Sequence, residues 1–389
     1  MSINRRNFIK ATGVSALPAI IPILPSFSAN EAREPGPSKP IIRLFGDAEM
    51  LEPGDYLTKL QEAHAASAIV KDRYGAGGVV EELEKNFVQI TGKEKAIFMP
   101  SGTMANEFAI AVLSDDNTKV FVQDTSHVYR DEGDAAQSVF HKRLMPLAKG
   151  ETFFTVEQLQ KAIEALPREE VFRSGIGAVS IENPVRRRDG RMVPLEEIKK
   201  ISAYCKEKNI KLHLDGARIF IASAWSGIPV KEYASYFDTI YISLYKYLGA
   251  SAGAILCGEK QIIDKMPHMM KVHGGSMYGN WTNAAMAAYR LPSIEKRFKE
   301  VVSRAGELVS ALNKLSSLQI KPLEGGTNIY SLQLPKNTSG KNLQEKLNAK
   351  YNIRIAAFDE ENRTLVTMNE TLLHQTTDYI VDAFRGSLG

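Results

Sequence analysis

Short runs of β-branched and aromatic residues alternate with amphipathic stretches along most of this 389-residue chain, from about Pro40 onward. Lys119–Asp124 (KVFVQD) has the composition of a strand, and residues 194–209 (PLEEIKKISAYCKEKN) place apolar side chains at helical spacing. Further strand-like runs are KAIFM, SGIGAVSIEN, IKLHLD, DTIYIS and GAILCG. Because helices between successive strands carry the chain back across a sheet, this alternation predicts an α/β fold with a mostly parallel sheet covered on both faces.

The pattern changes after about Met277. Two helical stretches (NAAMAAYRL and RAGELVSALNKL) lead there into the strand-like runs NIYSLQL, NIRIAAF and TLVTM. We therefore expect a large domain over residues 41–276 and a smaller α+β domain over residues 277–389.

Composition and charge argue against several classes of protein. The hydrophobic content of 44% and the charged content of 24% are ordinary for a globular protein. The net charge is +4, but residues 1–29 hold three basic residues and no acid, which leaves 46 bases against 45 acids. This balance gives no electrostatic basis for binding nucleic acid. Cys205 and Cys257 are too few for a disulfide framework or a metal cluster, and we expect both to be packed thiols.

The first 29 residues have the features of an export signal. Arg5-Arg6-x-Phe8-Ile9-Lys10 resembles the twin-arginine motif of bacteria, and a proline-broken apolar stretch ends in a small-x-small sequence. An ordinary secretory signal and a basic disordered tail are the alternatives. Residues 30–40 have the composition of a flexible linker, and no run of 18 apolar residues predicts a membrane span. We therefore expect the protein to be periplasmic or exported, by a twin-arginine pathway that carries folded proteins.

Polar residues stand at the ends of four predicted strands, where ligands bind in open α/β sheets. Each feature alone has a structural explanation: helix capping for a Ser-Gly-Thr turn, packing for a histidine, turn formation for an aspartate, and a long side chain reaching solvent for a lysine. The four features are Ser101-Gly102-Thr103, Ser126-His127, Asp215 followed by Arg218, and Lys246.

Together the four features fit one cofactor, pyridoxal 5'-phosphate. The Ser-Gly-Thr turn would hold the phosphate on backbone N–H groups at a helix N-terminus. Lys246 would form the Schiff base with the aldehyde, since partial burial lowers the pKa of an amine. Asp215 would keep the pyridine nitrogen protonated, and His127 would stack on the ring. The predicted catalytic residues are therefore Lys246, Asp215 and His127. Arg218 would face the ring oxygen or the substrate carboxylate.

The order of several motifs resembles the threonine aldolase and β-eliminating lyase family of pyridoxal phosphate enzymes. The resemblance runs from about Ile41 to the C-terminus and rests most on SGTMAN followed by LDGAR. It includes YGAGGVVEELEKNF, SHVYRDEGDAA, FDTIYISLYKYLGASAGAIL and HGGSMYGN. The resemblance implies the fold-type-I architecture: a large cofactor domain on a seven-stranded, mostly parallel sheet, and a small C-terminal domain. It also implies a homodimer or homotetramer with active sites at subunit interfaces.

Several positions on the substrate side differ from the family's motifs. ENPVR replaces the family's ENTHN, so Val185 stands where the family has a histidine that contacts the substrate hydroxyl. Tyr245 replaces the serine that usually precedes the lysine, and Tyr278 and Thr364 stand where arginines are expected. The residues expected to bind the cofactor are retained, whereas several residues expected to contact the substrate differ.

The basic run VRRRDGR, residues 185–191, lies beside the first of these altered positions. It is either a solvated loop or a source of substrate contacts. In the second interpretation Arg186, together with Arg218, binds the carboxylate or another anionic group of the substrate.

The leading functional prediction is a pyridoxal phosphate-dependent lyase that acts on an amino acid. It would cleave Cα–Cβ of a β-hydroxy amino acid in a retro-aldol reaction, or eliminate a β-substituent. An aminotransferase of the same fold would use Lys246 and Asp215 too, so these residues do not distinguish the two reactions. A third alternative is an exported binding protein without cofactor, which the retention of the whole cofactor set disfavours.

Overall fold

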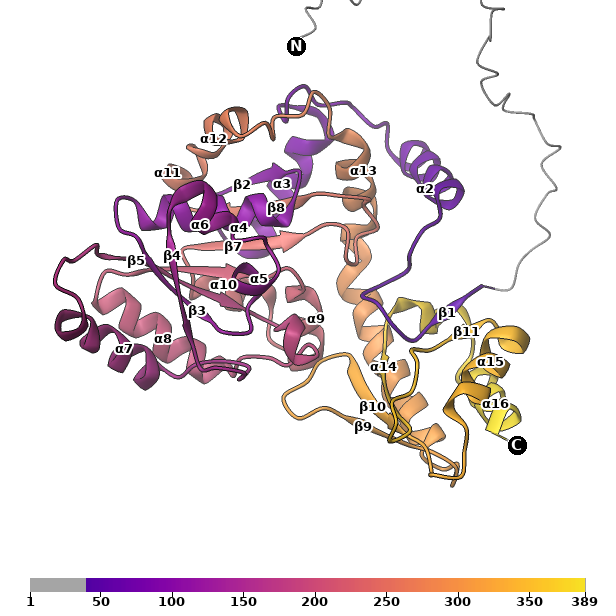
Figure 1. The fold of residues 1–389 in the computed structure, drawn as a ribbon. Coiled ribbons are helices and arrows are strands. Elements are labelled where there is room, and N and C mark those ends of the chain that lie inside the picture. Colours follow the sequence, from indigo (N-terminus) through magenta and orange to yellow (C-terminus); the bar gives the residue numbers. More distant parts are fainter. Residues whose placement is uncertain (1–39, 389) are drawn as a thin grey trace, which may run out of the picture. The chain divides into compact units, whose positions relative to one another are not determined.

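Seven strands form one sheet in the structure, a computed structural model that describes residues 40–388. The strand order is β2-β8-β7-β6-β5-β3-β4, and β8 runs antiparallel to both of its neighbours while the other pairs are parallel. The predicted α/β class with a mostly parallel seven-stranded sheet is therefore confirmed (Figure 1). The strands are β2 (Lys95–Met99), β3 (Lys119–Gln123), β4 (Arg143–Leu147), β5 (Ile176–Glu182), β6 (Lys211–Asp215), β7 (Thr239–Ser243) and β8 (Ala254–Gly258).

Helices cover both faces of this sheet, because successive strand residues point to opposite sides. Ile240 and Ile242 of β7 pack in one apolar cluster, whereas Tyr241 between them packs in another. The first cluster includes α3 (Gly78–Thr91), α7 (Val156–Glu169), α8 (Leu195–Glu207), α9 (Ile219–Ser226), α10 (Val230–Ser235) and α13 (Trp281–Arg290). The second includes α4 (Gly102–Ser114), α5 (His127–Arg130), α6 (Ala135–Phe140), α11 (Lys260–Ile263) and α12 (Met266–Val272).

Helix α8 shows how the sequence pattern produces this packing. Ile198 and Ile201 are buried in the first cluster, as their helical spacing predicts. Strand β4 lacks such a pattern, because Arg143 and Pro146 are exposed on this edge strand and only Leu144 is fully buried. A strand at the edge of a sheet tolerates proline and charge, which is why the sequence did not predict it.

A second layer is built from the C-terminal part of the chain. Its antiparallel sheet has the order β12-β10-β9, and a short parallel pair joins β1 to β11. A third apolar cluster fills this layer. Its members are β1 (Ile42–Arg43), β9 (Gln319–Pro322), β10 (Ile329–Gln333), β11 (Ile353–Arg354), β12 (Arg363–Thr367), α14 (Ile294–Leu312), α15 (Gly340–Tyr351) and α16 (Thr377–Leu388).

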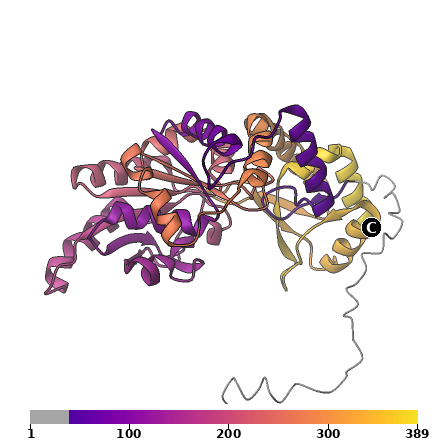
Figure 2. The ribbon, with the colours of Figure 1, turned by 90° about the horizontal axis from the view of Figure 1, so that it is seen from above.

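The C-terminal layer lies beside one end of the large sheet, with α14 running between them (Figures 1 and 2). Residues 40–389 form one compact unit, so the division into domains near residue 276 stays a prediction. The pairing of β1 with β11 brings the first described residues into the C-terminal layer. The remaining helical segments are α2 (Pro53–Ala66), η1 (Arg186–Arg188), η2 (Leu291–Ser293) and η3 (Glu370–His374).

The predicted twin-arginine signal, residues 1–29, lies outside the described residues, as does the linker up to residue 39. Among the helices within residues 40–388, none combines the length and the apolar character needed to cross a bilayer.

Candidate active site

The carboxyl ends of the parallel strands border a cavity of about 270 Å3. Parallel strands end at the same edge of a sheet, so residues far apart in the sequence meet there. All seven residues predicted to hold the cofactor line this cavity: Ser101, Gly102, Thr103, His127, Asp215, Arg218 and Lys246. The structure therefore brings the predicted constellation together, and it adds Glu132, Glu182 and Tyr245 to the lining.

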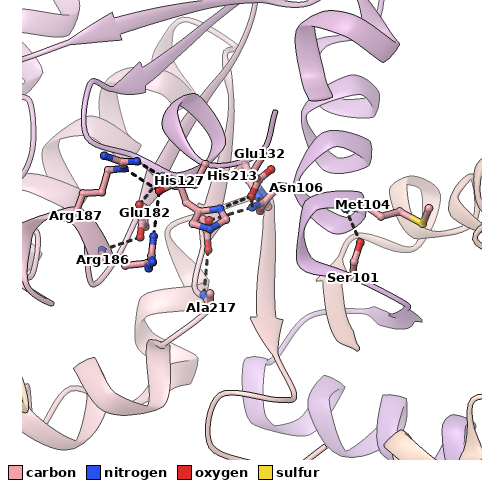
Figure 3. Close-up of polar contacts among 12 residues, drawn as sticks. Ser101, Met104, Asn106, His127, Glu132, Glu182, Arg186, Arg187, His213 and Ala217 are labelled. Carbon is pink, nitrogen blue, oxygen red and sulfur yellow. Dashed lines mark hydrogen bonds and ion pairs between the residues drawn. The ribbon is translucent and has the colours of Figure 1, made fainter. Parts of the chain in front are cut away.

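The Ser-Gly-Thr turn is the N-terminus of α4. Ser101 is the N-cap, and its hydroxyl accepts a hydrogen bond of 3.2 Å from the Met104 N–H (Figure 3). Within residues 40–388 the N–H groups of Gly102 and Thr103 have no hydrogen-bond acceptor. A Cβ on Gly102 would overlap the hydroxyl of Tyr241, so only glycine fits there. Free N–H groups and the helix dipole make this turn suitable for an anion.

Asp215 is the last residue of β6 and is 2% exposed. Its Oδ1 accepts a hydrogen bond of 3.1 Å from the Ala217 N–H, and its Oδ2 accepts one of 3.0 Å from the side-chain amide of Asn106. Two donors hold this carboxylate in a fixed orientation at the cavity wall. A carboxylate held in this way is oriented to pair with a cation in the cavity.

His127 begins α5 and contacts two carboxylates (Figure 3). Its Nδ1 lies 2.8 Å from Oε1 of Glu132, and its backbone N–H donates to Oε2 of Glu182 at 2.7 Å. Burial lowers the pKa of His127. The hydrogen bond with Glu132 and the charges of Asp215 and Glu182 raise it by more than burial lowers it, so this pKa lies above its ordinary value. The imidazole is thus oriented with Nδ1 toward Glu132.

Glu182 ends β5 and lines the cavity beside Asp215, its register partner on β6. Burial and the neighbouring Asp215 raise the pKa of Glu182 to about 7. Its Oε1 accepts the Arg186 N–H at 2.8 Å, and its Oε2 accepts the His127 N–H, so one carboxyl group joins two loops at the cavity.

Lys246 follows β7 and is 9% exposed. Burial and the positive charge of Arg218 lower the pKa of Lys246 to about 8. Within the described part of the chain its ammonium has no hydrogen-bond acceptor or ion pair, and lies 5.4 Å from the ring centre of Tyr245. An unpaired amine with a lowered pKa is suited to nucleophilic chemistry.

Arg218 lines the cavity but is already paired. Its Nε and Nη2 bind the two carboxylate oxygens of Asp47 at 2.6 and 2.9 Å. Burial lowers the pKa of Arg218, and Asp47 more than offsets this, so the guanidinium stays charged. Asp47 lies just after β1, and this pairing joins the N-terminal segment to the cavity.

Arg186 lies near the cavity without lining it. Its Nη1 is 3.4 Å from Oδ2 of Asp131, whose carboxylate is bound more closely by Arg187 at 2.9 and 2.5 Å. The side chain of Arg186 is 51% exposed. In this surface loop, Arg186 and Arg187 thus both pair with Asp131. The backbone N–H of Arg186 anchors the loop to Glu182.

The four positions that differ from the family's motifs lie in different surroundings. Tyr245 lines the cavity and is 49% exposed. Val185 is fully buried, and Thr364 lies 7% exposed in β12. Tyr278 is 63% exposed and packs edge-on against Tyr74, with ring centres 5.3 Å apart.

Four further residues at the cavity or its partners were not predicted from the sequence: Asp47, Asn106, Glu132 and Glu182. A strand-ending position was a usable signal for Glu182, since this rule identified Asp215. The others lie on a loop or inside a helix, where no local pattern distinguishes them. His127, Glu132 and Asp215 also bring three ligand atoms within 4.8 Å, a spacing that a metal ion would accept. Each of the three groups is already hydrogen-bonded to a protein partner.

Comparison with known proteins identifies the family of the chain. A model of the β-eliminating lyase family matches residues 57–334. A protein from Arabidopsis thaliana assigned as a low-specificity L-threonine aldolase is 30% identical over 72% of this chain and 79% of its own length. The low-specificity L-threonine aldolase of Saccharomyces cerevisiae is 29% identical over 76% of each chain.

Solved structures show the same fold. A chain from Exiguobacterium assigned as an aromatic amino acid β-eliminating lyase/threonine aldolase is 25% identical, with a TM-score of 0.75 over 90% of this chain and 97% of its own. A variant of serine palmitoyltransferase from S. paucimobilis, solved with a bound pyridoxal phosphate–myriocin aldimine, is 15% identical with a TM-score of 0.62, over 89% of this chain and 87% of its own. At that identity the similarity concerns the fold-type-I architecture alone. The family match over most of the chain confirms the family predicted from SGTMAN and LDGAR, and the protein belongs to the β-eliminating lyase family as a threonine aldolase-like lyase.

Proposed function

We propose that this lyase binds pyridoxal 5'-phosphate and cleaves the Cα–Cβ bond of a β-hydroxy amino acid such as L-threonine. The observation that carries the proposal is the shared cavity of Lys246, whose pKa is lowered to about 8, and Asp215, a carboxylate 2% exposed. Relatives described as L-threonine aldolases support the aldol reaction. β-Elimination from a β-substituted amino acid is the alternative reaction of the same site.

The residues present fit this cofactor in chemistry. The N-terminus of α4 offers N–H donors for a phosphate, and the missing Cβ of Gly102 lets the Tyr241 hydroxyl approach this turn. Asp215 offers a buried carboxylate for the cationic ring nitrogen, and Lys246 offers an amine without another partner among the described residues. When bound, the cofactor supplies an aldehyde for the amine and a ring that withdraws electrons from the substrate Cα.

The surroundings of Lys246 keep its amine uncharged in a fraction of the molecules near neutral pH. Its pKa is lowered first by burial and then by the positive charge of Arg218. Since only a neutral amine can attack a carbonyl carbon, this lowering increases the reactive fraction. The face of Tyr245 beside the amine provides a weak attraction for its charged form without a hydrogen bond.

His127 is the proposed acid and base for the substrate hydroxyl. Its Nδ1 is held by Glu132, which leaves Nε2 as the ring nitrogen that exchanges a proton. Glu132 stabilises the imidazolium, since the pKa of His127 lies above its ordinary value. Glu182 fixes the start of α5 through the His127 N–H and so positions the imidazole.

Arg218 is the proposed contact for the substrate carboxylate. Asp47 accepts from its Nε and from one hydrogen of Nη2, which leaves Nη1 and the second hydrogen of Nη2 to donate to a ligand. Arg186 is the proposed second contact for an anionic group, because its exposed side chain pairs with Asp131 only at 3.4 Å.

We also propose a homodimer or homotetramer. A groove of about 520 Å3 between α2 and α13 is lined mainly by apolar side chains, including Leu57, Leu60, Ile69 and Trp281. On α13, two residues beyond Trp281, Asn283 accepts hydrogen bonds from the cavity residues Ser251 and Ala252. Covering this groove by a second subunit would thus affect the catalytic cavity. Light scattering of the wild type and of Leu57→Glu tests this, and a monomeric wild type would contradict it.

Export by a twin-arginine signal is proposed from the sequence of residues 1–29 alone. A folded enzyme with a bound cofactor suits a pathway that carries folded proteins.

Product analysis after incubation with L-threonine and with β-substituted amino acids tests the proposed reaction. Release of glycine and an aldehyde indicates aldol cleavage, and release of a keto acid and ammonia indicates elimination. Borohydride reduction followed by peptide mapping should place the cofactor on Lys246. Stoichiometric transfer of the amino group to a keto acid, or reduction onto another lysine, contradicts the proposal.

A further inference from the structure

Asn106 is a fully buried side chain that bridges two carboxylates of the cavity (Figure 3). Its Nδ2 donates to Oε1 of Glu132 at 2.8 Å and to Oδ2 of Asp215 at 3.0 Å. Both hydrogens of one amide nitrogen are therefore used, one for each carboxylate. Asn106 lies in the second turn of α4, whose first turn is the proposed phosphate site.

The two carboxylates determine the orientation of this amide, because a carboxylate accepts hydrogen bonds and so faces the NH2 group. The Oδ1 of Asn106 lies 2.9 Å from Nε2 of His213, and since amide oxygen only accepts, the hydrogen must be on Nε2. Burial lowers the pKa of His213 to about 4, so its imidazole is neutral with a single proton. The other ring nitrogen, Nδ1, then accepts from the hydroxyl of Thr239 at 2.8 Å.

The hydrogen bonds thus run in one direction, from Thr239 through His213 and Asn106 to the two carboxylates. Thr239 and His213 are register partners on β7 and β6, and both are 0% exposed. A rotated amide would set its oxygen against the oxygens of two carboxylates, where no hydrogen bond can form. Only one arrangement is therefore consistent, which makes the network rigid.

Glu132 and Asp215 lie close enough for repulsion, with one oxygen of each within 4.8 Å of the other and of a ring nitrogen of His127. Two carboxylates this close repel each other unless a donor lies between them. A neutral amide between them satisfies both without becoming a counter-ion itself. Asp215 remains available for a ring cation, and Glu132 for the imidazole of His127.

We propose that Asn106, held in place by His213, is a positioning residue. Its amide orients the Asp215 carboxylate toward the cofactor's ring nitrogen and the Glu132 carboxylate toward His127. The inference rests on the proposed function, because it gives Asp215 the same partner. Neither Asn106 nor His213 lines the cavity, so each acts through Asp215 and Glu132.

Asn106→Ala tests the inference, with Asn328→Ala as the matched control. Asn328 is also buried, at 4% exposure, and its amide donates to the Met368 carbonyl in the C-terminal layer. We expect Asn106→Ala to weaken binding of pyridoxal phosphate to the apoprotein about tenfold and to lower kcat about a hundredfold, with KM changed little. The absorbance of the bound cofactor and its pH dependence should change as well. Asn328→Ala should lower only the thermal midpoint.

His213 provides a second pair of variants if Asn106→Ala does not fold. His213→Gln retains a donor for Asn106 and should largely preserve cofactor affinity and absorbance, whereas His213→Phe removes the donor and should reproduce Asn106→Ala. Normal cofactor affinity and absorbance in Asn106→Ala or His213→Phe, with cofactor linked to Lys246, would overturn this inference alone. A wild type without cofactor on Lys246 would overturn the proposed function and this inference together.

Discussion

The carboxylate of Asp47 holds the guanidinium of Arg218 at two points, with Nε–Oδ1 at 2.6 Å and Nη2–Oδ2 at 2.9 Å. The pairing connects the segment after β1 with the residue that precedes α9. Arg218 in turn is a cation that lowers the pKa of Lys246, so the N-terminal segment influences the reactive amine through one ion pair.

Breaking this pair should destabilise the protein. The side chains of Arg218 and Asp47 are only 16% and 27% exposed, so Asp47→Asn leaves a mostly buried guanidinium without its counter-ion. We expect a loss of about 2–3 kcal/mol in the free energy of unfolding, somewhat below the value for a fully buried pair. Urea unfolding of both single variants and the Asp47→Asn, Arg218→Leu double variant measures the coupling.

A weak surface pair provides the control for that cycle. Lys296 and Glu300 are 84% and 51% exposed and 4.0 Å apart, so Lys296→Ala should change stability little. Strictly additive effects of Asp47→Asn and Arg218→Leu would show that the two side chains do not stabilise each other.

Removing the charge of Lys246 should stabilise the apoprotein in a pH-dependent way. The folded pKa is about 8 against an ordinary 10.5, so below pH 8 the folded protein bears the full cost of burying an ammonium. Between pH 8 and 10.5 the folded state loses its proton first, so wild-type stability rises with pH. Lys246→Met should therefore be more stable by about 3 kcal/mol at pH 7, and the difference should vanish toward pH 10.5.

Urea unfolding of the two apoproteins across this pH range checks the expectation. A stability difference that does not change with pH would mean that Lys246 is not desolvated. The same variant should have no turnover, because the amine is absent.

Asp215→Asn should slow the chemical step more than it weakens binding. The amide keeps the shape of the carboxylate and its contact with the Ala217 N–H, but it lacks the charge that stabilises a ring cation. We expect kcat to fall by about two orders of magnitude or more, with a smaller loss of cofactor affinity. Steady-state kinetics and a cofactor titration separate the two effects. Near-wild-type kcat would mean that the carboxylate forms the turn and has no catalytic role.

Gly102→Ala should damage the phosphate end of the cavity. The added methyl would overlap the Tyr241 hydroxyl, so either the first turn of α4 or the ring must move. We expect the affinity for pyridoxal phosphate to fall at least about tenfold, measured by titration of the apoprotein. Gly306→Ala on α14 is the control, because its Cβ would meet open space and should raise stability by about 0.5–1 kcal/mol. Equal cofactor affinity in both variants would argue against a phosphate at this turn.

Changing Arg5 and Arg6 together to lysine should keep the protein in the cytoplasm, folded and with bound cofactor, because twin-arginine recognition depends on the paired arginines. Cell fractionation combined with cofactor absorbance measures the location and the folded state. Arg33→Lys in the linker conserves charge in the same manner and should be exported normally. Export of the double-lysine variant would indicate an ordinary secretory signal.

The sequence by itself determined the fold class and the residues at the strand ends. Alternating helical and strand patterns depend on neighbours a few residues apart, so β6, β7 and α8 could be predicted from local spacing. Asp215 and Lys246 stood out because parallel strands direct the residues that follow them to a common edge.

Only the tertiary structure decided the direction of β8, the pairing of β1 with β11 and the partners of the catalytic groups. The run GAILCG has the same composition whether its strand is parallel or antiparallel. Asn106 lies in a helix whose apolar pattern continues around it, and Asp47 lies on a loop, so no local pattern marks them. Their roles arise because packing brings Asn106 to Asp215 and Asp47 to Arg218, and contacts between distant segments depend on the whole core.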